Sequence, residues 1–302
     1  MSGIEFKSEW AGKPLHELPD GASGYKSRPA EQALNEMADG GVVITEAEDF
    51  MRAIPQTFSF PQVCNPLDYL KVKNQQQKGS CQGHSLAGVG EMNFWVATGG
   101  DIERFSGDAT YVLSQEKDGI KGDRGSTPTA GAWVAQNIGL VPESAYGPTV
   151  KTYNELKPVT DAHRQAAADY KMSSIVRLKS YDQMYQFLGA GLGAIQVCSL
   201  WKQHFMAKYV TTFFGEAHNS RHAGGHAYLC NGYNKNGDLL CTNSWGHGSN
   251  THDEGGFLTS RNFWEELFSD KMSFVLGYSN MKTSKSQPPG PRTIPVKASD
   301  WV

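Results

Sequence analysis

Apolar residues recur at helical spacing in the first half of this 302-residue chain and fall in short alternating runs in the second half. The clearest helix is predicted directly after Cys81, where Leu86 and Val89 lie on one face and a glycine pair at 99–100 ends the pattern. From about residue 173 the apolar runs become short and rich in β-branched residues, which is typical of strands. Further helices are predicted over 107–119, 130–139 and 162–171, and strands over 173–181, 193–201, 226–234, 238–246 and 272–279. A helical half followed by a strand-rich half predicts an α+β fold.

The two ends of the chain differ in composition from the middle. Residues 1–58 are polar and weakly patterned, with short helices predicted over 30–38 and 46–54. Two interpretations of this N-terminal segment stay open: a loosely packed arm, or a pro-segment that inhibits an enzyme. Residues 284–302 are rich in proline, which predicts an extended C-terminal tail.

Charge and composition argue against several classes of function. The formal net charge is −3 and the isoelectric point is near 6.3, and no block of basic residues stands out, so we expect no binding to nucleic acid or to a membrane surface. The sequence has no apolar run of the length that spans a membrane, and its first residues do not predict a secretory signal. Five sparse cysteines suit the cytoplasm or another reducing compartment better than a disulfide scaffold.

The stretch KNQQQKGSCQGHS contains Cys81, which is a candidate nucleophile. A nucleophilic cysteine needs a base, a group that orients the base, and hydrogen-bond donors for an oxyanion. Farther along, an NKNG turn predicts a hairpin whose strands place His226, Asn243 and Trp245 on one face. Asn243 could then hold one ring nitrogen of His226 and leave the other for a thiol.

A helix that starts at Cys81 would favour the reactive form of its side chain. The N-terminus of a helix and a nearby imidazolium both lower the pKa of a thiol below the free value of about 8.5. When the thiolate attacks a carbonyl group, the backbone N–H of Cys81 and the side-chain amide of Gln75 could donate to the oxyanion. These residues therefore predict thiol-dependent chemistry that needs neither a metal nor an organic cofactor.

The same residues resemble the papain family of cysteine peptidases. The segments VKNQ…GSC…S, GHAYLCNGY and NSWG are similar to its nucleophile segment, its histidine strand and its asparagine–tryptophan motif, and they occur in the same chain order. The resemblance extends over residues 59–283. It implies a two-lobed α+β peptidase domain, with a helical lobe over about 75–170, a β-barrel-like lobe over about 171–283, and the active-site cleft between them.

Matched position by position, the resemblance implies a cysteine endopeptidase that acts on polypeptides through an acyl-enzyme. Cys81 would be the nucleophile, His226 the acid and base, and Asn243 the residue that orients His226. Gln75 would donate to the oxyanion. The residues implied in substrate binding, or as cover over the asparagine, are Gly125, Ser126, Ala227 and Trp245.

Two positions beside the nucleophile depart from the family pattern. Lys78 stands where the family usually has a cysteine that is paired in a disulfide, so we expect that disulfide framework to be absent. Gln82 stands where an aromatic residue is usual, which predicts a changed floor of the cleft. Residues 1–58 also lack the long helical pro-region pattern that is common in the family.

Two alternative functions use the same fold. A thiol amidase or transpeptidase would rely on the same residues and pass the acyl group to a different acceptor. A catalytically silent peptide-binding protein would keep the fold without turnover, although the complete set of Cys81, His226, Asn243 and Gln75 argues against it.

Other histidines and cysteines allow competing interpretations. His84, one helical turn after Cys81, is interpreted as a neighbour of the nucleophile and not as its base. His218, His222 and His226 are spaced as zinc ligands could be on a helix, but the intervening AGG disfavours a helix, and no metal site is predicted. No function is assigned to the remaining cysteines, of which the last two are interpreted as packed thiols: Cys64, Cys198, Cys230 and Cys241.

Overall fold

The computed structural model describes residues 29–52, 71–202, 212–213, 222–246 and 256–284. Its α-helices are α1 (Ala30–Asp39), α2 (Ala47–Met51), α3 (Cys81–Thr98), α4 (Gly107–Asp118), α5 (Pro128–Trp133), α6 (Glu143–Tyr146), α7 (Asp161–Ala167), α8 (Tyr181–Gly189) and α9 (Arg261–Ser269). A π-helical turn covers Val134–Ile138 and a 3₁₀ turn covers Tyr153–Glu155. The strands are β1 (Ile44–Glu46), β2 (Lys171–Arg177), β3 (Gly193–Lys202), β4 (Thr212–Phe213), β5 (His222–Tyr233), β6 (Leu239–Thr242), β7 (Gly256–Thr259) and β8 (Phe274–Lys282). None of these described helices has the length and apolar character that crossing a bilayer requires.

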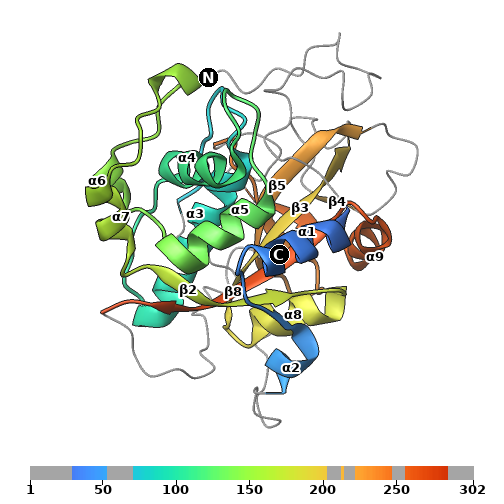
Figure 1. Cartoon of the computed structure of the whole chain (residues 1–302). Helices are drawn as coiled ribbons and strands as arrows, with labels where there is room; N and C mark the ends of the chain where they lie inside the picture. Colours follow the sequence, from blue (N-terminus) through green and yellow to red (C-terminus); the bar gives the residue numbers. More distant parts are fainter. Residues whose placement is uncertain (1–28, 53–70, 203–211, 214–221, 247–255, 285–302) are drawn as a thin grey trace.

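The strands of the described residues form one eight-stranded sheet in the order β1-β2-β8-β3-β5-β6-β7-β4. Neighbouring strands are antiparallel except for the two outer pairs, β1–β2 and β4–β7, which are parallel. Helix α3 packs against β3, β5 and β8, and α8 packs against β3 and β5. Figure 1 shows α3, α4 and α5 on one side of β8 and α8 on the other. The predicted α+β class is confirmed, with the helical elements concentrated before β2 and the strands after it.

Nearly every residue of helix α3 is buried, the polar ones as well as the apolar ones. It lies so close to α4 that a Cβ atom on Gly83 would come within 2.5 Å of the backbone oxygen of Gly107. Gly99 ends the helix in the left-handed conformation, with φ of 77°, as the glycine pair predicts. The tight packing fixes the start of α3, and with it Cys81, against the rest of the helical lobe.

Several elements differ from the sequence-based prediction. Helix α7 ends at Ala167, and Lys171, which was assigned to that helix, begins strand β2. Tyr181 was placed at the end of a strand but is the first residue of α8, because the Ser180 side chain accepts a hydrogen bond from the Gln183 backbone N–H and starts a helix there. Helices α6, α8 and α9 and strands β1, β4 and β7 were not predicted.

The described part of the N-terminal segment is packed into the domain. Met37 of α1 is fully buried and belongs to the same apolar core as α3 and the sheet. Strand β1 extends the sheet through Ile44, which pairs with Ile175 of β2. The backbone N–H of Val43 donates to Gln136 Oε1 at 2.8 Å. The rest of the predicted arm and nearly all of the predicted C-terminal tail lie outside the described residues.

Candidate active site

Cys81 is the first residue of α3, and its side chain is fully buried. Ser80 occupies the N-cap position but makes no side-chain capping hydrogen bond, and the first turn contains no acidic residue. The positive end of an 18-residue helix is therefore directed at Cys81 without a carboxylate of its own first turn to neutralise it. Such a position favours the anionic form of a thiol.

The β5–β6 hairpin brings His226 and Asn243 together. Beside the NKNG turn Tyr233 pairs with Leu239, one residue out of the predicted register; a bulge between Cys230 and Gly232 restores that register, and the ladder ends where Leu229 pairs with Thr242. Just beyond it, His226 Nε2 lies 2.7 Å from Asn243 Oδ1, and both side chains are buried. The amide oxygen can only accept, so Nε2 donates, and in a neutral ring Nδ1 is then the nitrogen that can take up a proton.

Two tryptophans surround the His226 ring. The ring of Trp245 lies 4.7 Å from the imidazole at an interplanar angle of 32°, and Trp201 meets it edge-on at 4.9 Å. Burial lowers the pKa of His226 to about 4, while the hydrogen bond with Asn243 acts in the opposite direction. At neutral pH the imidazole is therefore uncharged and ready to act as a base. Trp201 was not singled out from the sequence, because an isolated tryptophan on a strand resembles any core residue.

The Gln75 side chain is held at both ends of its amide group. Ser244 Oγ donates to Gln75 Oε1 at 2.7 Å, and Gln75 Nε2 donates to the backbone oxygen of Lys78 at 2.7 Å. The Gln75 backbone N–H also donates to the Ser244 backbone oxygen at 2.7 Å. An amide nitrogen carries two hydrogens, so one remains for a substrate oxygen. The role of Gln75 is predicted from the sequence, whereas its hydrogen bonds with Ser244 and Lys78 are not.

Lys78, which stands where the family usually has a cysteine, forms a buried ion pair. Its Nζ lies 3.3 Å from Asp108 Oδ1 at the start of α4 and also donates to the backbone oxygen of Val150. Both charged side chains are fully buried. The next residue, Gly79, donates its backbone N–H to Asp123 Oδ1 at 2.8 Å. None of the four cysteines in the part of the chain that the structure describes forms a disulfide.

His84 is tied into the same cluster. Its Nδ1 lies 3.0 Å from the Ser80 backbone oxygen, and its Nε2 lies 3.6 Å from Asp108 Oδ1. Burial, assisted by the positive charges of Lys78 and Lys73, lowers the pKa of His84 to about 3. The ring is therefore neutral, and its Nδ1 is engaged by the loop before Cys81, which agrees with its interpretation as a neighbour of the nucleophile.

The Gln82 side chain points toward α5. Its Oε1 accepts a hydrogen bond from Ser126 Oγ at 3.0 Å. Its Nε2 would lie 1.6 Å from a Cβ atom on Gly131, so only glycine leaves room for it there. Gln82 thus links the start of α3 to the segment that contains the predicted substrate-binding residues.

The predicted substrate-binding residues lie in two parts of the fold, Gly125 and Ser126 before α5 and Ala227 on β5. Gly125 donates its N–H to Tyr111 Oη at 3.1 Å and accepts from Gln115 Nε2 at 3.0 Å, so both of its backbone polar groups already have partners in α4. Ala227 follows His226 on β5, is fully buried, and pairs with Cys198 of β3. Burial raises the pKa of the Cys198 thiol, and the proximity of Cys81 acts in the same direction. Contacts of Gly125, Ser126 and Ala227 with substrate stay a prediction.

The histidine spacing that suggested zinc does not form a helical face. His222 and His226 both lie on strand β5, and His218 lies outside the described residues. Within the ranges that the structure describes, no group of three or more His, Cys, Asp or Glu side chains is arranged to hold a metal ion.

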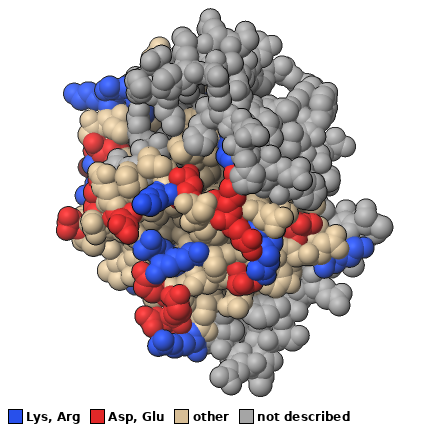
Figure 2. Space-filling view, turned by 90° about the vertical axis from the view of Figure 1, so that its right-hand side faces the viewer, with Lys and Arg blue, Asp and Glu red and all other residues tan. Residues whose placement is uncertain are grey.

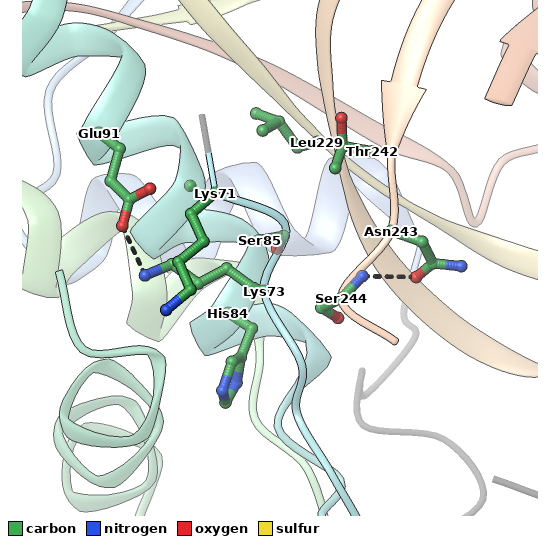
Figure 3. Close-up of a pocket in the computed structure, with 10 residues that line it drawn as sticks. Lys71, Lys73, His84, Ser85, Glu91, Leu229, Thr242, Asn243 and Ser244 are labelled. Atoms are coloured by element: carbon green, nitrogen blue, oxygen red, sulfur yellow. Dashed lines mark hydrogen bonds and ion pairs between the residues drawn. The ribbon is translucent and has the colours of Figure 1, made fainter. Parts of the chain in front are cut away.

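A small cavity of about 20 Å³ lies between α3 and the β5–β6 hairpin, large enough for about one water molecule (Figure 3). On one wall Lys73 Nζ and Glu91 Oε1 form an ion pair at 2.5 Å. On the opposite wall the Ser244 backbone N–H donates to Asn243 Oδ1 at 2.8 Å, so that oxygen accepts from both Ser244 and His226. The Asn243 amide is thereby held in one orientation. The cavity is lined by Lys71, Lys73, His84, Ser85, Gly88, Glu91, Leu229, Thr242, Asn243 and Ser244.

The outer surface carries charges of both signs. On the face drawn in Figure 2, acidic and basic side chains are interspersed, without a broad patch of one sign.

Comparison with known proteins gives a consistent result. The family described as papain family cysteine protease matches residues 55–269. No curated protein matches. Among solved structures, xylellain, a cysteine protease from Xylella fastidiosa, is 19% identical with a TM-score of 0.68, and the match covers 90% of this chain and 99% of that one. Procathepsin L2 from the larval midgut of Tenebrio molitor is 21% identical with a TM-score of 0.63, covering 89% of this chain and 84% of that one. At these identities the structural likeness concerns the fold.

Proposed function

This chain belongs to the papain family and is a cysteine peptidase, and we propose that it cleaves within polypeptides by a mechanism that uses Cys81, His226 and Asn243. The observation that carries the proposal is the 2.7 Å hydrogen bond between His226 Nε2 and Asn243 Oδ1. It assigns the ring hydrogen to Nε2 and leaves Nδ1 to exchange a proton with the nucleophile.

Acylation begins when His226 Nδ1 takes the proton of the Cys81 thiol. The thiolate attacks the carbonyl carbon of the scissile peptide bond, and the C=O electron pair moves onto oxygen. The Cys81 backbone N–H and the remaining N–H of Gln75 donate to this oxyanion. When the oxyanion collapses, the C–N bond breaks and the His226 imidazolium gives its proton to the leaving amine. The acyl group is then joined to Cys81 as a thioester.

Deacylation repeats these roles with water in place of the thiol. His226 Nδ1 takes a proton from water while the water oxygen attacks the thioester carbonyl, and the same donors hold the second oxyanion. Collapse releases the carboxylic acid, and the Cys81 thiolate leaves and can be reprotonated. Throughout the cycle Asn243 Oδ1 keeps the Nε2 hydrogen in place, so it orients the base without itself reacting.

A cysteine-directed epoxide tests the identity of the nucleophile. We expect one equivalent to label the protein at neutral pH, with the mass of the modified peptide assigning the label to Cys81. Cys81→Ala should lose the label and lower turnover of a cleaved peptide, chosen from a library digest, by at least about 10⁴-fold. Cys241→Ala removes a buried thiol of the β5–β6 hairpin and serves as the matched control, which should keep label and turnover.

Two results would contradict the proposal. One is turnover by Cys81→Ala close to that of the wild type, and the other is stoichiometric labelling at a different cysteine. Addition of a small amine to the digest checks the acceptor, because transfer of the acyl group to the amine in preference to water would indicate a transpeptidase.

A further inference from the structure

We propose that the buried Lys78–Asp108 ion pair positions the Gln75 amide for the oxyanion. The proposal rests on the role given to Gln75 in the function above. Lys78 touches no reacting atom in this scheme and would act through Gln75 alone, which makes it a positioning residue.

Lys78 connects the Gln75 amide to the helical lobe, because its backbone oxygen binds Gln75 and its side chain binds residues of that lobe. Its backbone oxygen accepts the hydrogen bond from Gln75 Nε2 at 2.7 Å. Its side chain, fully buried, extends to Asp108 and to the backbone oxygen of Val150. A movement of the Lys78 side chain would therefore move the acceptor that sets the direction of the Gln75 amide.

The anchor for Lys78 is itself fixed. Asp108 lies in the first turn of α4, and its Oδ2 accepts from the Val150 backbone N–H at 2.9 Å. Val150 thus binds Asp108 through its N–H and Lys78 through its C=O, which closes a three-membered network. Gly79 is held separately by Asp123, whose Oδ1 also accepts from Tyr111 Oη at 3.1 Å. Both residues of the turn before Ser80 are therefore fixed by carboxylates.

The other end of the Gln75 amide is fixed by the β-rich lobe, through Ser244 Oγ. An amide group is planar, so anchoring its oxygen at Ser244 and one of its hydrogens at Lys78 determines the direction of the second hydrogen. The oxyanion donor is thus aligned from the two lobes at once. If Lys78 moved, the Gln75 amide would be held only by its hydrogen bond with Ser244.

The contact between Lys78 and Asp108 depends on their opposite charges. Burial alone lowers the pKa of Lys78 and raises the pKa of Asp108, and the attraction between the two groups opposes both shifts. A buried charge that loses its partner is strongly destabilising, so changing Lys78 alone could prevent folding. The informative variant is Lys78→Met with Asp108→Asn, because it removes both charges while the asparagine oxygen can still accept from Val150.

The experiment measures kcat and KM per active site, titrated with the cysteine-directed epoxide, together with thermal unfolding. For the Lys78→Met/Asp108→Asn protein we expect a cooperative unfolding transition, kcat lowered by about 10- to 100-fold and KM changed by less than about threefold, since small misplacements of catalytic groups cost up to about 10²-fold. In a Gln75→Ala background the same pair of changes should cost less than about threefold further, because the group it positions is already gone.

Lys73→Met is the matched control. Lys73 is also a buried lysine near Gln75, but its ammonium group binds Glu91, Glu143 and the Phe105 backbone oxygen, and no hydrogen bond joins it to the Gln75 amide. Glu91 keeps its ion pair with Arg104 at 2.9 Å, so this variant should fold, unfold at a lower temperature and keep kcat per titrated site within about threefold of wild type.

Three outcomes separate the possibilities. Wild-type kcat in the Lys78→Met/Asp108→Asn protein would overturn the proposal, leaving the ion pair a purely structural role. Full additivity with Gln75→Ala would overturn it as well, because Lys78 would then act by another route. Wild-type turnover in Gln75→Ala alone would remove the oxyanion role on which the inference stands, while labelling at Cys81 would still support the rest of the proposed function.

Discussion

The His226 imidazole and the Gln75 amide are both positioned by side chains that do not react. Asn243 Oδ1 accepts from His226 and from the Ser244 backbone, while Ser244 Oγ binds the Gln75 amide oxygen. Two consecutive residues after β6 therefore orient the base and the oxyanion donor. The backbone of Cys81 is fixed by the helix that it begins.

Replacement of Asn243 tests this division between orienting and reacting residues. Asn243→Ala removes the acceptor for His226 Nε2 and lets the ring turn, but it leaves both the nucleophile and the base in place. We expect kcat to fall by about 10²-fold, within the range that general acid–base catalysis contributes, and to stay well above that of Cys81→Ala. Steady-state kinetics of the two purified variants make the comparison.

Asn243→Asp is the control, since its carboxylate oxygen can still accept from Nε2. It should retain more activity than Asn243→Ala near neutral pH. Loss in Asn243→Ala as complete as in Cys81→Ala would mean that Asn243 takes a direct part in the chemistry.

At the scale of elements, the packing of α1, β1 and α2 bears on whether the N-terminal segment is a removable pro-segment. Their interaction with the domain runs through the core, at Met37, and through the sheet, at Ile44. A segment that contributes core residues stabilises the fold, whatever the preceding residues do. Residues 30–52 are accordingly expected to stay with the mature enzyme.

Met37→Ala measures how much this segment contributes. Loss of a fully buried methionine should lower the free energy of unfolding by about 2–5 kcal/mol, because it leaves a cavity in the shared core. Val43→Ala, at a side chain of the same segment that is 69% exposed, is the control and should change it by less than about 0.5 kcal/mol. Denaturant titrations give both values, and equal stability of the two variants would show that the segment is not part of the core.

The sequence predicted best the contacts between residues that are close together along the chain. The NKNG turn makes β5 and β6 neighbours, so the approach of His226 to Asn243, 17 residues apart, follows from local pattern, whereas the bulge between Cys230 and Gly232 that adjusts their register was not predicted. The Gln75–Ser244 and Lys78–Asp108 contacts span 169 and 30 residues and arise only when separate elements pack. For α8 a local cue did exist, the Ser180 cap, but the apolar run before it was extended too far as a strand.

For the molecule as a whole, two buried neutral histidines make stability depend on pH. The pKa values of His84 and His226 are lowered by burial to about 3 and about 4, whereas in the unfolded chain they lie near 6.5. Below about pH 6.5 these histidines take up protons in the unfolded state but stay neutral in the folded state. The free energy of unfolding therefore decreases as the pH falls from about 6.5 toward 4. Asp108 and Asp123 act in the opposite direction, because burial raises the pKa of both carboxyl groups.

The expected effect is at most about 1.4 kcal/mol per pH unit for each histidine. Urea unfolding at pH 7.5 and pH 5.0 should show a lower free energy of unfolding at the lower pH. His84→Gln removes one titrating group and should give a smaller difference between the two pH values. An unchanged difference in this variant would mean that His84 does not contribute.

Strand β1 also has a consequence for self-association. It is only three residues long, lies parallel to β2, and covers the edge along which Ile175 and Val176 would otherwise present unpaired backbone groups. A long apolar edge strand is a template for pairing with another copy of the chain, whereas a short edge with a charged residue such as Glu46, here bound to Lys179, is a poor one. The N-terminal segment therefore also protects the sheet against aggregation.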